Sequence, residues 1–175
     1  MKNYIFFLLL FISVMTGMYA DEQHDIAEIH QLYTNVIHRA KSDGMYHAHI
    51  TVNEEDHSWR ALGTFAQDMD IYFDDSLKTE DGPLIYVKIA AKLSAGYRNE
   101  EYLFNADGNL VFVFYEDHYH EDVKHHIYLK NSAPFLYKKG DEEIRKNLDA
   151  EEFPLQWCIA RGKRLYDFTF YVLMH

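Results

Sequence analysis

Histidines and carboxylates gather in residues 116–126, and their side-chain types are those that bind transition metals. Four histidines lie within nine residues: His118, His120, His125 and His126. Imidazole nitrogens and carboxylate oxygens are common ligands of Zn²⁺ and related ions. If residues 110–129 form a hairpin, His118 or His120 at its tip approaches His125. The alternative interpretation is a solvated loop in which histidines cluster by chance, since no cysteine and no HExxH spacing accompanies them.

A second pair of histidines, His47 and His49, alternates along a predicted strand over residues 45–53. Alternate residues of a strand point to the same face, so both side chains leave the sheet on one side. We interpret them as exposed or hydrogen-bonded sheet histidines. His57 follows beyond the next turn.

Cys158 is the sole cysteine, so no internal disulfide is predicted. It lies on an apolar stripe beside Trp157 and Ile159, which favours a buried structural role over a reactive thiolate. No Gly-x-Ser-x-Gly elbow, phosphate-binding glycine loop or dinucleotide fingerprint occurs. The residues therefore do not predict an enzyme.

Aromatic side chains offer a possible binding face. The chain holds 14 Tyr and 12 Phe, residues that favour pleated, half-buried surfaces. Tyr86, Tyr102, Phe112 and Tyr128 come from successive predicted strands and are candidates to line a groove for a hydrophobic or sugar-like ligand. The alternative is that they form cross-strand pairs within the core.

These residues are positioned by a predicted antiparallel sheet whose clearest signal is a hairpin at Asp107-Gly108. Apolar runs flank this turn at residues 102–104 and 110–115, and apolar residues on both sides of the second run predict a central strand. Further strands are predicted over residues 45–53, 59–65, 69–73, 84–93, 123–129 and 135–137. Residues 116–122 are predicted to form a charged loop, and Lys138 and Lys139 suit a sheet edge.

Helical patterns lie at the two ends of the chain. Apolar residues recur at three- and four-residue steps over residues 21–42, which predicts an amphipathic helix that Asp43-Gly44 ends. Residues 142–148 also favour helix, and a last helix is predicted to begin within a few residues of Pro154. The predicted fold class is α+β, with an N-terminal helix, an antiparallel meander of about five or six strands and a C-terminal helix. Residues 21–175 form one domain in this interpretation.

Residues 1–20 have the pattern of a cleaved signal peptide, with Lys2, an apolar run over residues 5–14 and Ala20 before the expected cleavage point. The apolar run is short for a membrane span, and a retained anchor is the alternative. We therefore predict a secreted or periplasmic protein without stable membrane insertion. The formal charge of −11 argues against nucleic acid as a partner.

A leader, one amphipathic helix and a long antiparallel meander with an Asp-Gly hairpin resemble cystatin-like and NTF2-like α+β domains. The pattern is also similar to small exported bacterial proteins of unknown function that share this architecture. The cystatin signature Gln-x-Val-x-Gly is not present, and no local motif marks the Asp–His pair of NTF2-like isomerases. No functional residue is carried over, because fold alone does not define function.

The expectation from sequence is an exported bacterial protein that binds an unknown protein or small-molecule ligand on its aromatic sheet face. Two alternatives stand beside it. One is zinc binding through the histidines of residues 118–126, and the other is a small-molecule enzyme with an NTF2-like pocket.

Overall fold

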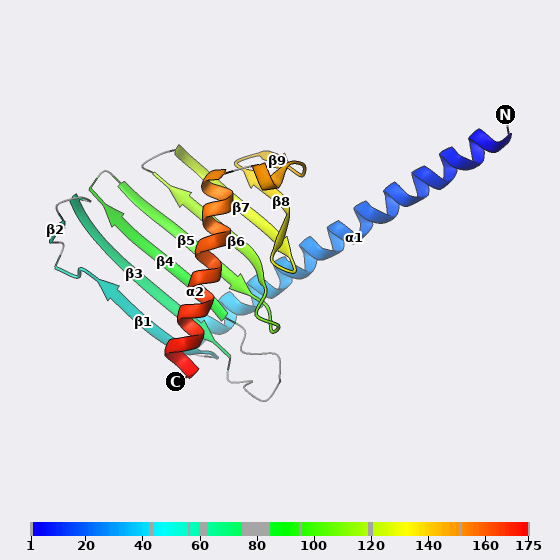
Figure 1. The fold of residues 1–175 in the computed structure, drawn as a ribbon. Helices are drawn as coiled ribbons and strands as arrows, with labels where there is room; N and C mark the ends of the chain where they lie inside the picture. Colours follow the sequence, from blue (N-terminus) through cyan, green and yellow to red (C-terminus); the bar gives the residue numbers. More distant parts are fainter. Residues whose placement is uncertain are drawn as a thin grey trace.

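The computed structural model describes residues 2–42, 44–55, 57–59, 63–74, 85–94, 96–118, 121–150 and 152–174. They form one antiparallel sheet with a helix on each face (Figure 1). The helices are α1 (Lys2–Lys41) and α2 (Trp157–Met174), and the short helical turns η1 (Leu148–Ala150) and η2 (Glu152–Gln156) precede α2. The α+β class and the two terminal helices predicted from the sequence are confirmed.

The strands are β1 (Tyr46–Val52), β2 (Ser58–Trp59), β3 (Gly63–Phe73), β4 (Ile85–Leu93), β5 (Gly96–Phe104), β6 (Leu110–Asp117), β7 (Glu121–Lys130), β8 (Ala133–Lys139) and β9 (Glu142–Ile144). Within the described ranges, eight of them follow the path β1-β3-β4-β5-β6-β7-β8-β9, and β2 pairs with β3 outside it. The prediction of five or six strands is therefore wrong. All eight strands of the path, including the short β1 and β8, belong to one sheet, with β1 and β9 at its two edges.

One face of the sheet packs against α1. Ile29 and Val36 of this helix are buried against a row of strand residues that includes Leu103 and Phe112. Salt bridges at the helix margin add to this contact, for example Asp25 with Lys130 at 2.7 Å. No helix within the described ranges has the length and apolar character that crossing a membrane requires.

The opposite face packs against α2, whose Cys158 is fully buried. At Gly162 the helix lies so close to the sheet that a Cβ atom would be 2.8 Å from Leu110 Cδ2 and 3.1 Å from Tyr102 Cδ1. Glycine therefore permits the close approach of α2 to β5 and β6. Because both faces are covered, β6 is a central strand, as its doubly apolar sequence predicted.

The turn between β5 and β6 confirms the predicted hairpin. Gly108 has φ +76°, a conformation that glycine adopts without strain, and its N–H donates to the Asn105 carbonyl. The turn lies under α2, because a Cβ on Gly108 would collide with the Tyr166 hydroxyl. Gly108 therefore serves both the turn and the packing of α2.

Three local predictions are wrong. Residues 142–148 do not form a helix: after Gly140 (φ +60°) the chain folds back, and β9 pairs with β8. The Lys138–Glu143 ion pair at 2.7 Å and the packing of Ile144 against the core outweigh the helix propensity of this segment. β8 is consequently not an edge strand. Residues 116–122 are also mostly strand, since β6 ends at Asp117 and β7 begins at Glu121.

Candidate functional sites

The four aromatic residues proposed as a binding face are all buried, with at most 6% of any one exposed. Tyr102 lies on the α2 side, whereas Tyr86, Phe112 and Tyr128 lie on the α1 side. Within the fold they serve as core residues on two faces. They do not form one open surface.

The three described histidines of residues 118–126, namely His118, His125 and His126, do not form one group at metal-binding distance. His125 is buried on the α2 side, where its Nδ1 lies 2.7 Å from the Tyr137 hydroxyl. His126, next in the strand, points to the opposite face and lies near Phe114. Burial lowers the pKa of His126, and the nearby charge of Lys138 adds to this effect. Consecutive strand residues point to opposite faces, so this pair does not chelate one ion.

His118 lies at the end of the sheet, beyond β6. Its Nε2 contacts the Tyr97 hydroxyl and lies 3.1 Å from Asp122 Oδ1. Glu116 brings a second carboxylate within metal-binding distance of the group. His120 lies outside the described residues.

A polar cluster is buried between the sheet and α2, and its centre is Glu100. Its carboxylate lies 2.8 Å from Arg98 Nε and 2.6 Å from Arg161 Nε, and the Tyr102 hydroxyl donates to it at 2.6 Å. Both guanidinium groups also stack on the ring of Trp157, at 5.5 and 5.2 Å from its centroid. The cluster is therefore paired and well packed, which suits a structural role more than a reactive one.

Cys158 lies near this cluster, and burial raises the pKa of its thiol well above the ordinary value. The negative charge of Glu100 contributes to the same shift. The thiolate, which is the reactive form, is therefore disfavoured. The geometry agrees with the structural role that the sequence predicted.

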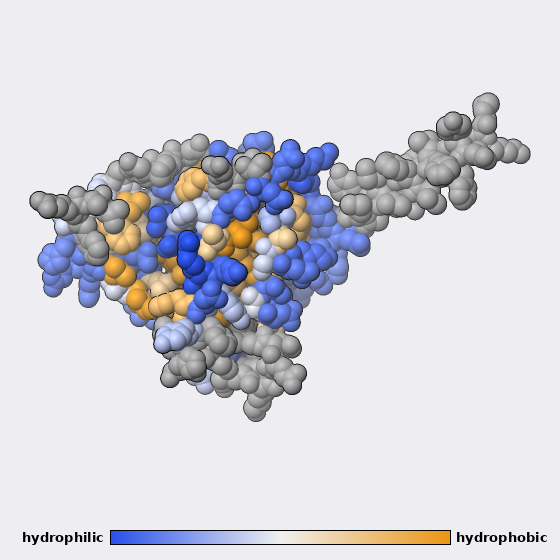
Figure 2. Space-filling model, in the orientation of Figure 1, coloured by the Kyte–Doolittle hydropathy of each residue, from blue (hydrophilic) through white to orange (hydrophobic). Residues whose placement is uncertain are grey.

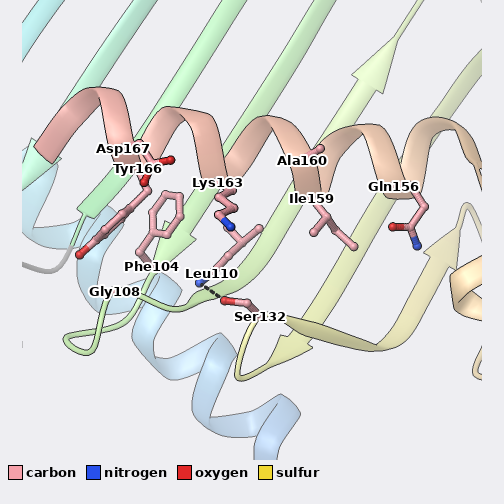
Figure 3. A pocket seen from close by; sticks show the side chains of 10 residues that line it. All are labelled: Phe104, Gly108, Leu110, Ser132, Gln156, Ile159, Ala160, Lys163, Tyr166 and Asp167. Atoms are coloured by element: carbon pink, nitrogen blue, oxygen red, sulfur yellow. Dashed lines mark hydrogen bonds between the residues drawn. The ribbon is translucent and has the colours of Figure 1, made fainter. Parts of the chain in front are cut away.

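An open groove runs along α2 on the side of the β5–β6 turn (Figure 3). Its cavity volume is about 480 Å³. The floor is formed by Phe104 and Leu110, and Ile159 extends toward it from the helix. Tyr166 reaches from α2 to the turn at Gly108 and closes one end, with its ring 5.2 Å from that of Phe104.

Polar groups lie at the margins of this groove. Gln156 lies at the end of the groove opposite Tyr166. Lys163 and Asp167 are exposed at the rim of the groove. The Ser132 hydroxyl accepts a hydrogen bond from the Leu110 N–H at 3.2 Å, which joins the β7–β8 turn to the floor. In the space-filling view, hydrophobic surface borders the hydrophilic outer side of α2 (Figure 2).

On the other face of the sheet, His47 and His49 of β1 meet Asp70 of β3. The sequence indicated that the two histidines share a face. It did not indicate Asp70 as their partner, because that requires the register between β1 and β3. The signal available was the alternation of acidic residues over residues 68–74, which places Asp68 and Asp70 on one face.

Comparison of the chain with protein-family models, with curated proteins and with solved structures finds no match. The resemblance to cystatin-like and NTF2-like domains therefore stays a prediction from the sequence pattern.

Proposed function

We propose that this protein is an exported bacterial binding module, and that the groove beside α2 holds a small ligand with an apolar body and an anionic end. The observation that carries the proposal is the groove itself, whose volume of about 480 Å³ lies within the range of ligand pockets. Its floor is apolar, as small-molecule sites mostly are. Export rests on the predicted leader of residues 1–20.

The position of Lys163 supports the choice of an anionic end. Its ammonium group lies in the groove between the apolar floor and solvent (Figure 3), where a carboxylate or sulfonate would find a counter-charge without losing its hydration. Asp167 lies one turn further along the helix, so the field at the rim is positive only near Lys163. An anionic group is therefore directed to one end of the site.

Binding is proposed in preference to catalysis because both charged groups of the groove are exposed to water. Catalytic acids and bases usually lie in clefts that shelter them from water. Lys163 and Asp167 have no such shelter.

The test uses anilinonaphthalene sulfonate, a fluorescent probe that has apolar rings and an anionic group. We expect saturable fluorescence enhancement with the native protein, and at least a tenfold loss of affinity in Ala160→Trp, which fills the groove. Lys163→Ala should weaken binding several-fold, whereas Arg164→Ala should not, since Arg164 is equally basic and exposed but does not line the groove.

Circular dichroism melts of each variant separate loss of the site from loss of the fold. Equal probe affinity in the parent and in a folded Ala160→Trp variant would exclude the groove as the binding site. Absence of saturable binding to the parent would also contradict the proposal.

A further inference from the structure

His47, His49 and Asp70 meet on the exposed part of the sheet face that α1 leaves uncovered. β1 is the first strand of the sheet path, and His49 pairs directly with Asp70 across the β1–β3 ladder. Directly opposite residues have Cβ atoms about 4.5–5.5 Å apart, and His47 follows two positions away on the same face. The backbone thus brings two imidazoles and one carboxylate to a single point.

The donor atoms are already close to the spacing that one ion requires. Asp70 Oδ1 lies 2.9 Å from His47 Nε2 and 2.8 Å from His49 Nδ1. Bonds of about 2.0–2.2 Å to a shared tetrahedral ion place such donors roughly 3.3 Å apart. Each O–N separation therefore needs to widen by about half an ångström, and the three donor atoms already lie within 4.8 Å of one another.

The hydrogen bonds around His49 orient its ring for this purpose. The Thr51 hydroxyl donates its proton to Asp68 Oδ1 at 2.9 Å, and its oxygen lies 3.0 Å from His49 Nε2. Because that hydroxyl proton is already donated, the Thr51 oxygen accepts from Nε2–H. In the neutral ring the lone pair is then on Nδ1, which points at Asp70.

This arrangement sets a nitrogen lone pair against a carboxylate oxygen at 2.8 Å. A proton or a metal cation between the two atoms removes the repulsion. His47 is held beside them, because its ring stacks on Tyr72 at 4.6 Å between centroids. The Thr51–Asp68 pair behind His49 is the kind of outer contact that fixes the ring orientation of metal-binding histidines.

We propose that His47, His49 and Asp70 bind one divalent transition metal ion of the Zn²⁺ type. Two imidazole nitrogens and one carboxylate favour such an ion over Mg²⁺ or Ca²⁺, which take oxygen ligands. The three side chains are 45%, 50% and 29% exposed, so the remaining coordination positions face water. The site is thus an open one, accessible in the folded protein.

The group at His118 is the competing location. It offers a single imidazole with two carboxylates, and its His118 Nε2 is already engaged by both Tyr97 and Asp122. With one imidazole instead of two, it is the poorer ligand set for an ion of the Zn²⁺ type.

The experiment is isothermal titration of the purified protein with ZnCl₂, with Mg²⁺ and Ca²⁺ as comparison ions. We expect one strong Zn²⁺ site and no measurable heat from the other two ions. The His47→Ala, His49→Ala double variant should lose at least tenfold in affinity, and Asp70→Asn should also weaken binding. His118→Ala should leave the strong site in place.

The matched control is the His24→Ala, His57→Ala double variant. It removes two exposed histidines that each pair with a single glutamate, Glu28 and Glu55. We expect its affinity to stay within twofold of the parent. Because none of the substituted side chains is buried in the core, all variants should keep the parent far-ultraviolet dichroism spectrum.

Absorption of the Co²⁺-loaded protein gives a second readout, since a nitrogen-containing tetrahedral site produces visible bands that the double variant should lack. The proposal is overturned if the parent binds no Zn²⁺, or if His47→Ala, His49→Ala binds as tightly as the control. Loss of the strong site in His118→Ala alone would instead assign it to the group at the end of β6.

Discussion

Glu100 has a fully buried carboxylate in the α2 interface, where it lies between Arg98 and Arg161. Breaking a buried ion pair leaves uncompensated charge out of water, at a cost of about 3–5 kcal/mol. We expect Glu100→Gln, which keeps the shape and removes the charge, to lower the free energy of unfolding by that amount. The measurement is urea denaturation followed by tryptophan fluorescence.

Glu28→Gln provides the control for this prediction. Glu28 is 64% exposed, and its ion pair among the described residues is with His24 on the surface of α1. Substitution there should change stability by no more than about 0.5 kcal/mol. A Glu100→Gln variant as stable as Glu28→Gln would mean that the two arginines find other partners or water.

The faces on which single residues lie could be predicted from the sequence, but their partners could not. The strand period placed His47 and His49 on one face, and the structure confirms that placement. The same period puts His125 and His126 on opposite faces of the sheet. The predicted cluster of four histidines at residues 118–126 therefore included two neighbours that do not point to one site. Asp70 and Glu100 could not be assigned from the sequence, because their partners depend on strand register and on the docking of α2.

The contact between α2 and the sheet is the element-scale feature that a single substitution tests best. Alanine favours a helix over glycine by about 1 kcal/mol. At Gly162, however, the added methyl group would meet Leu110 Cδ2 at 2.8 Å, and overpacking costs about 1–3 kcal/mol. We therefore expect Gly162→Ala to lower the thermal midpoint in spite of its better helix propensity.

Lys163→Ala serves as the reference, since this neighbouring position is exposed. Its thermal midpoint should stay close to that of the parent. A Gly162→Ala variant more stable than the parent would show that α2 can move away from the sheet without loss, and that the close approach is not required.

Elements with a strong local signal were predictable. The N-terminal helix, the Asp107-Gly108 hairpin, the central strand β6 and the last helix each carry a period or a turn that specifies them. β9 was missed because Glu142, Glu143 and Ile144 have no strand period of their own. Their conformation follows from the Gly140 turn and from pairing with β8, which are tertiary effects.

At the scale of the whole molecule, the sheet buries apolar side chains on both faces, so each helix covers a core that the other cannot reach. Isolated sheets with one apolar face exposed are prone to association. The fold should therefore depend on the packed part of α1 as well as on α2. It should not depend on the predicted leader, which precedes the described contacts of α1.

The contacts of α1 define where the chain can be shortened. The contacts that α1 makes before residue 38 include the ion pairs of Glu22 with Arg145 and of Asp25 with Lys130. Ile29 and Val36 then fill the core on this face. A cut after Ala20, the predicted cleavage point, leaves all of these contacts in place, whereas a chain starting at residue 38 lacks all of them.

We expect residues 21–175 to unfold cooperatively at the same urea midpoint as the full chain, and residues 38–175 to show no cooperative transition. Loss of one buried Ile, Leu or Met side chain costs about 2–5 kcal/mol, so loss of the whole apolar stripe of α1 removes most of a typical stability of about 5–15 kcal/mol. Cooperative unfolding of residues 38–175 would mean that α2 and the sheet form a stable unit alone. Failure of residues 21–175 to fold would mean that the first 20 residues belong to the domain, which would also contradict the predicted cleavage, because a removable leader cannot hold part of the core.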